Sequence, residues 1–173
     1  MPYFPFESDA ARAAAIYFTK REGGRINKMK LVKLMYIVER TALQEAETAL
    51  FGGKYFSLPY GPIISEVVDA LDGETWSGLQ KSGSHDVALT PGVEVPNEFL
   101  SVWSGEMLER VYREYGHMDQ WQISEYTHAH FKEWKQPQGA IKRVPITLSD
   151  ILPEPNAELE SLAAELTFLD SLS

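Results

Sequence analysis

The sequence predicts a mainly α-helical α+β fold, a compact bundle of about five to six helices with one small antiparallel β-hairpin. Apolar residues recur at helical spacing in several segments that glycine or proline separates. Only residues 74–96 lose this period and contain two short strand-like runs. The length of 173 residues, 44% of them hydrophobic, suits one globular domain. We predict a helical domain over 1–143, with the hairpin near 85–95, and an acidic C-terminal extension over 144–173.

The first two helices are expected before residue 50. Ser8 can cap a helix that Gly23 and Gly24 end. Asn27 can cap a second helix running to about Glu47, whose wide apolar arc is typical of a central helix. The rest of its surface carries a polar ridge, which we interpret as a solvated edge or as a surface for an acidic partner: Lys30, Lys33, Arg40 and Gln44.

Residues 51–62 combine glycines, prolines and aromatic residues, which predicts an ordered loop without regular structure. Pro62 suits the first position of a third helix that ends at Gly73. Residues 85–90 and 93–95 then read as two strands around the turn Pro91-Gly92, which gives the expected hairpin.

Three further elements are expected in the second half. A fourth helix begins at Asn97 or Ser101 and ends at Gly116, and a fifth covers about 119–131. An extended piece follows over 143–148. The last helix is amphipathic, with leucines at 3-4-3 spacing between acidic residues: Leu159, Leu162, Leu166 and Leu169.

The composition restricts compartment and partners. The chain has no cysteine, no apolar run of about 20 residues and no signal-peptide pattern, so we expect a cytoplasmic protein. A net charge of −9 makes nucleic-acid binding unlikely. Residues 144–173 carry six acids and no Lys or Arg. This acidic end is either a solvated face or a docking segment for a basic partner.

No motif for catalysis, a cofactor or a metal is found. His128 and His130 lie two positions apart and point to different sides of a helix, so they cannot share one ion. Glu125 and His128 have the spacing of half a di-iron site, but no second copy stands out. Nucleotide-binding glycine loops and a serine nucleophile elbow are also missing. We therefore expect no enzyme activity, no cofactor and no metal.

Aromatic residues near loops and helix ends are the stronger signal. They either fill the core or form a contact patch rich in Tyr and Trp, residue types that dominate binding hot spots. The set is Tyr55, Phe56, Tyr60, Trp121, Tyr126 and Trp134.

Three motifs together resemble the Panacea domain, the SocA-like antitoxin family also described as phage-associated. The stretch 26–36, Ile-Asn-Lys-Met-Lys-Leu-Val-Lys-Leu-Met-Tyr, is similar to the family's basic, leucine-rich helix ending in a tyrosine, here Tyr36. Tyr60-Gly61-Pro62-Ile63 resembles the family's Gly-Pro turn, and residues 124–128 with Trp134 resemble its Thr-His…Trp segment. Ile123 stands where the family tends to have leucine, and the acidic tail has no counterpart in it.

The resemblance implies an antitoxin that neutralises a partner toxin by direct protein–protein binding. The first alternative is an adaptor that delivers the toxin to a protease. A nucleic-acid-binding regulator or an enzyme is a less favoured alternative. We expect the partner contact to draw on the motif residues and the terminal helix. The expected contact residues are Tyr36, Tyr55, Tyr60, Gly61, Pro62, Thr127, His128, Trp134, Leu162, Leu166 and Leu169. Thr127 and His128 have an equally plausible structural role, tying the fifth helix to the loop.

Overall fold

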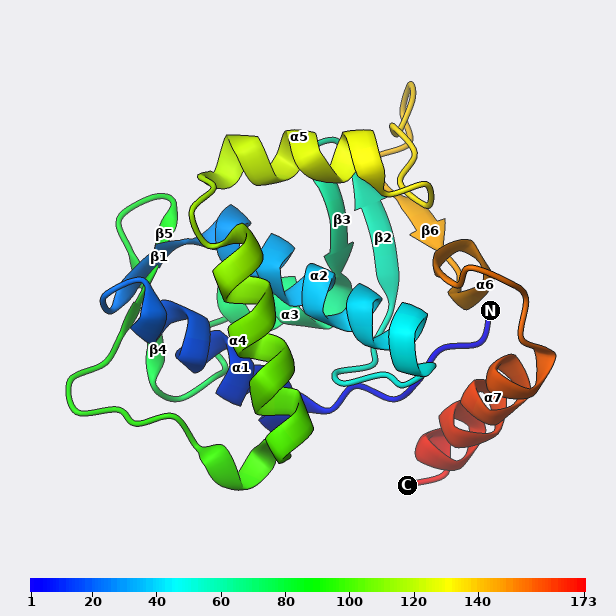
Figure 1. Cartoon of the computed structure of the whole chain (residues 1–173), viewed down its shortest axis with the longest axis horizontal. Coiled ribbons are helices and arrows are strands. Elements are labelled where there is room, and N and C mark those ends of the chain that lie inside the picture. The colour runs from blue at the N-terminus through cyan, green and yellow to red at the C-terminus, as the bar shows by residue number, and fades with distance from the viewer.

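The computed structural model describes all residues, 1–173, and confirms the mainly helical α+β class. It contains seven α-helices and two small antiparallel sheets, which lie on different sides of the molecule (Figure 1). The helices are α1 (Ser8–Arg21), α2 (Lys28–Ala46), α3 (Ser65–Asp72), α4 (Val102–Tyr115), α5 (Gln120–His130), α6 (Leu148–Ile151) and α7 (Ala157–Ser171). The strands are β1 (Arg25–Asn27), β2 (Tyr55–Leu58), β3 (Gly61–Ile64), β4 (Leu79–Ser82), β5 (Asp86–Leu89) and β6 (Val144–Ile146).

Helix α2 forms the centre of the molecule. The Asn27 side chain caps it as the sequence predicts, because its oxygen accepts the backbone N–H of Lys30 at 3.1 Å. Helices α1, α4 and α5 and strand β3 all pack against α2. The predicted solvated edge is wrong at two of its four positions. Lys30 and Lys33 are buried, because this side of α2 is covered by the rest of the fold.

The first sheet has the strand order β1-β5-β4 and contains a hairpin with strands other than those predicted. Residues 86–89 do form a strand, but it pairs with β4 across the turn at 83–85 and not with 93–95. Gly83 has a φ of +64°, which supplies the left-handed conformation for this turn. On its other edge β5 pairs with β1, so the ribbon is stabilised by a third strand.

The second sheet, of order β3-β2-β6, replaces the predicted irregular loop. Residues 55–58 and 61–64 pair as a hairpin around Pro59 and Tyr60. Pro62 lies within β3 and does not open a helix; α3 begins at Ser65. Proline is tolerated there because β3 is an edge strand, where a missing N–H removes little from the ladder.

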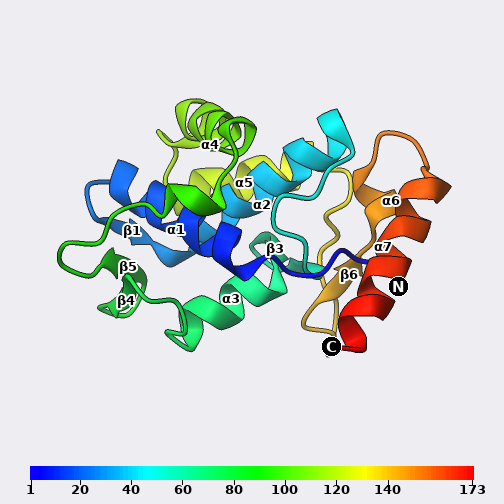
Figure 2. The same cartoon turned by 90° about the horizontal axis from the view of Figure 1, so that it is seen from below.

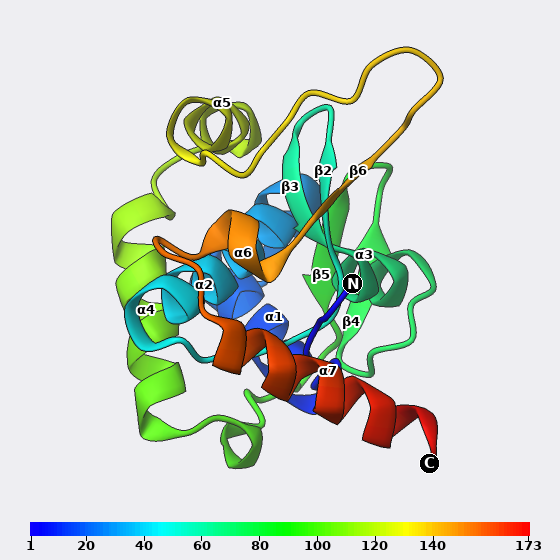
Figure 3. The same cartoon turned by 90° about the vertical axis from the view of Figure 1, so that its right-hand side faces the viewer.

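The chain after residue 143 continues directly into this sheet. Strand β6 pairs antiparallel with β2, and the short helix α6 is tied to α2 by Gln44, whose side-chain amide donates to the Ile151 carbonyl at 2.9 Å. Helix α7 then runs across the N-terminal segment at the end of the molecule away from α5 (Figures 1 and 3). Its cap is Asn156, whose oxygen accepts the N–H of Leu159.

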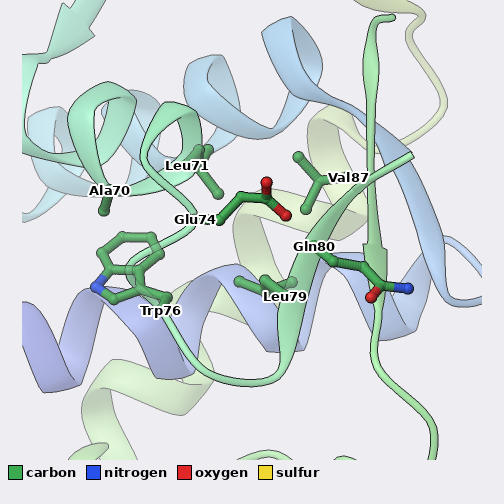
Figure 4. A pocket seen from close by; sticks show the side chains of 7 residues that line it. All are labelled: Ala70, Leu71, Glu74, Trp76, Leu79, Gln80 and Val87. Carbon is green, nitrogen blue, oxygen red and sulfur yellow. The ribbon is translucent and has the colours of Figure 1, made fainter. Parts of the chain in front are cut away.

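A tightly packed recess between α3 and the β4–β5 hairpin is part of the core. Trp76, Leu79 and Val87 line it and are buried, and the Glu74 side chain extends between Leu71 and Val87 (Figure 4). It has no room for even one water molecule. None of the seven helices combines the length and apolarity that crossing a bilayer requires.

Candidate partner-binding site

The motif residues that lie far apart in sequence come together where α5 crosses the end of the β2–β3 hairpin (Figure 1). The Ser124 hydroxyl donates to the Tyr60 carbonyl at 2.5 Å, and the Trp134 indole N–H donates to the Leu58 carbonyl at 2.8 Å. Ser57 in β2 accepts the backbone N–H of Lys135 at 3.1 Å. Residues 124–135 therefore fasten the hairpin at its turn and at the adjoining end of β2. We call these contacts, with that of Lys33 below, the hairpin clamp.

Lys33 extends from α2 to the β3 strand of the hairpin. Its ammonium donates to the Pro62 carbonyl at 3.0 Å, and the residue is only 2% exposed. Burial lowers the pKa of Lys33 to about 7, because an ammonium inside the protein loses its hydration. The side chain therefore changes charge near neutral pH.

Thr127 and His128 follow on α5. Thr127 is fully buried and its hydroxyl donates to the Ser124 carbonyl at 2.7 Å. The His128 ring stacks on the Trp134 indole, with ring centroids 3.7 Å apart and planes 15° from parallel. The Nε2 atom of His128 is enclosed without a hydrogen-bond partner. Desolvation, and then the charge of Lys33, lower the pKa of His128, so the neutral ring is favoured.

Tyr60 and Trp121 form the exposed part of this region. Tyr60 is 56% exposed at the hairpin turn and Trp121 is 53% exposed on the first turn of α5. Their rings pack edge to face with centroids 5.5 Å apart. A hollow of about 270 Å³ adjoins Trp121 and is lined mainly by polar residues, among them Asn27, Ser84 and His85. The surface thus offers two aromatic rings beside a polar recess.

Two of the expected contact residues serve the core instead. Tyr36 is fully buried and its hydroxyl donates to Glu133 at 2.9 Å, while Tyr55 is 2% exposed and donates to Glu39 at 2.7 Å. Arg40 completes this group with an ion pair to Glu133 at 2.6 Å. The structure therefore places Tyr36 and Tyr55 in the core, where their side chains do not face a partner that binds this conformation.

The same reasoning applies to the turn itself. Gly61, Pro62 and Thr127 are buried, so they hold the hairpin without facing solvent. His128 and Trp134 are half-buried, so they remain candidate contact residues beside the exposed Tyr60–Trp121 pair. Leu162, Leu166 and Leu169 are exposed, but they lie on α7, at the other end of the molecule from the hairpin turn (Figure 3). The expected contact residues therefore do not form one surface.

Sequence reasoning gave Lys33 and Ser124 no role in holding the hairpin. The charge of Lys33 favours a solvated edge or a surface for an acidic partner, and only its place in the family-like motif could have indicated a structural role. No group of three or more His, Asp or Glu side chains is placed to hold a metal ion.

The fold and the hairpin clamp define an α+β domain that holds a strand turn rigidly and exposes aromatic rings beside it. Residues 31–135 match the family model described as antitoxin SocA-like, Panacea domain. This match covers more than half of the chain, and the chain belongs to that family. No match is found among curated proteins or solved structures. The matched range contains the whole hairpin clamp and ends before β6 and α7.

Proposed function

We propose that this chain acts in the cytoplasm as an antitoxin that neutralises a partner toxin by direct binding, without catalysing a reaction. The observation that carries the proposal is the exposed pair of Tyr60, on the clamped hairpin turn, and Trp121, on the first turn of α5. Both residues lie within the range that matches the antitoxin family. Large aromatic side chains are the most frequent anchors of protein interfaces.

Rigidity of the supporting elements strengthens this proposal. The Tyr60 carbonyl is held by Ser124, and the Asp119 side chain caps α5 by accepting the N–H groups of Trp121 and Gln122. A side chain on a fixed backbone loses less conformational entropy when it binds than one on a mobile loop. The backbone positions of the two aromatic residues are thus fixed before a partner binds.

The test is co-expression with the product of the adjacent open reading frame, taken as the toxin. We expect growth to be rescued by the wild-type chain and lost with the double substitution Tyr60→Ser, Trp121→Ser. Both side chains are more than half exposed, so the melting temperature should change little. Size-exclusion chromatography of the co-expressed pair should show a complex for the wild type only.

Trp103→Ser is the matched control, because Trp103 is an exposed tryptophan on α4. It should keep both rescue and complex. Rescue by the double variant at wild-type level would place the contact elsewhere, and a wild-type chain that binds no toxin would contradict the antitoxin proposal itself.

A proteolytic adaptor is the second candidate, favoured by one observation. An adaptor needs two separate interaction surfaces, and the exposed leucines of α7 lie apart from the Tyr60–Trp121 pair (Figure 1). Toxin half-life in cells distinguishes the two. Faster toxin loss in the presence of this chain supports the adaptor, while a long-lived inactive complex supports sequestration.

A further inference from the structure

Helix α7 is packed against the protein by one narrow side only. Leu159 and Ala163 are buried, and the Thr167 hydroxyl donates to the Tyr3 carbonyl. The neighbouring face carries large apolar side chains in solvent. Leu162 is 46% exposed and Leu169 is 52% exposed, with Leu166 between them. We call these three residues the α7 ridge.

A groove lined by Leu162 and Leu166 of the α7 ridge lies between α7, the N-terminal segment and the loop after α2. Figure 3 shows α7 running beside the N-terminal segment. It is an open groove with a volume of about 350 Å³. Its apolar lining comes from Phe4, Pro5, Ala49, Leu159, Leu162 and Leu166. An aliphatic or aromatic side chain entering it would therefore be covered from both sides.

Acidic residues border this apolar strip. Glu7 and Glu47 lie at the groove, and Glu158 and Glu165 flank Leu162 on the solvent side of α7. Residues 144–173 contain no Lys or Arg, and none of the eight ion pairs of the chain involves an acid from this range. The carboxylates around the α7 ridge, Glu7 and Glu47 included, therefore form no ion pair within the chain.

This combination selects the occupant. A second copy of the chain would bring the same acids, and a net charge of −9 on each copy opposes that pairing. A helix with one apolar face and flanking Lys or Arg residues fits both the groove and its acidic border. We infer that the α7 ridge and its groove bind a basic amphipathic helix of another protein. This surface is separate from the Tyr60–Trp121 pair, and the inference does not depend on the toxin contact.

The probe is a fluorescent amphipathic peptide of Leu and Lys, about 18 residues or five helical turns long. Its binding to the full chain is followed by anisotropy, beside a scrambled peptide of the same composition and an amphipathic peptide of Leu and Glu. We expect the amphipathic Leu/Lys peptide to bind most tightly, more weakly at higher salt, and hydrogen exchange to slow in residues 159–169 and 47–52. The double substitution Leu162→Ser, Leu166→Ser should weaken binding roughly tenfold or more.

Two controls keep the result interpretable. Val102→Ser removes an apolar side chain that is 81% exposed on α4 and should leave the affinity unchanged. Leu169→Ser, at the exposed end of the α7 ridge, gives a second test if the double variant is poorly folded. The inference would be overturned if the scrambled peptide bound as tightly as the amphipathic one, or if both ridge variants bound the peptide with wild-type affinity. A dimer of the wild type in light scattering that the ridge variants lose would overturn it as well.

Discussion

Gly61 lies directly against Thr127, whose side chain occupies the space that a Cβ atom at position 61 would need. A Cβ at Gly61 would be 2.7 Å from the Thr127 hydroxyl and 2.9 Å from Cε of Lys33. The φ of Gly61 is +124°, which L-amino acids rarely adopt. The turn therefore requires glycine for both its backbone conformation and the close approach of α5 and α2.

Gly61→Ala or the larger Gly61→Val should destabilise the protein. Backbone strain and the steric clash together lead us to expect a loss of about 2–4 kcal/mol in the free energy of unfolding, and more for valine. Urea denaturation measures it. In co-expression with the toxin, rescue should fall with the loss of the turn.

Gly24→Ala is the control for backbone strain, because Gly24 has a φ of +102°, nearer to that of Gly61, and nothing lies within 4 Å of its Cβ position. It should cost less than Gly61→Ala. Equal losses for the two alanine variants would mean that the contact with Thr127 and Lys33 contributes nothing.

Lys33 makes stability depend on pH above neutrality. Its folded pKa of about 7 lies below that of an unfolded lysine, about 10.4, so between these values the unfolded state binds more protons. The free energy of unfolding should therefore rise with pH in this window, by up to about 1.4 kcal/mol per pH unit. Below pH 7 this contribution stops changing, because both states are protonated.

The variant Lys33→Met isolates this effect, because methionine fills similar space without a charge. The difference in unfolding free energy, wild type minus variant, should increase from pH 7 to pH 9. Other groups titrate in both proteins and cancel in the difference. A difference that stays constant over this range would show that Lys33 keeps its charge in the folded state.

Glu39 fixes the loop after α2. Its buried carboxylate accepts the backbone N–H groups of Leu50, Phe51 and Gly52 at 2.7, 3.0 and 2.7 Å, and the Tyr55 hydroxyl at 2.7 Å. Glu39→Gln replaces one acceptor oxygen by a donor that faces other donors, so we expect a loss of about 2–4 kcal/mol. Tyr55→Phe removes one bond only and should cost about 1 kcal/mol in the same urea titration. A glutamine variant no less stable than Tyr55→Phe would contradict this role.

The helices could be predicted because their signals are local. Asn27 and Ser101 each cap a helix by accepting a backbone N–H, and each is followed by apolar residues at helical spacing. The cap predicted at Ser8 is wrong: α1 begins after Glu7 without a side-chain cap, and the Ser8 hydroxyl accepts the Trp76 indole N–H instead. The strands could not be paired in the same way. Residues 86–89 were recognised as a strand, but their partners, 79–82 and 25–27, were not. Strand pairing depends on contacts between distant segments, which local patterns do not encode.

The site was predictable in part for a related reason. The motifs identified Gly61, Thr127 and Trp134 as residues that belong together, and the structure places them around one hairpin turn. The sequence motifs do not reveal which of these residues face solvent. Tyr36 and Tyr60 are the same residue type in neighbouring motifs, yet one is fully buried and the other 56% exposed. Burial follows from the packing of α5 and residues 131–134, which the sequence does not specify locally.

The last helix should be separable from the rest of the chain. We predicted an acidic extension over 144–173, but β6 and α6 are joined to β2 and α2, so we expect the separable part to begin at Asn156. A chain that ends at Pro155 loses the burial of Leu159 and Ala163 and should be less stable by about 1–3 kcal/mol. Its urea unfolding should remain one cooperative transition, and its circular dichroism should lose only the signal of α7. Leu159→Ala in the full chain should account for most of the loss, since Leu159 is the largest buried side chain of this helix. A broad or multi-step transition in the shortened chain would show instead that α7 belongs to the core.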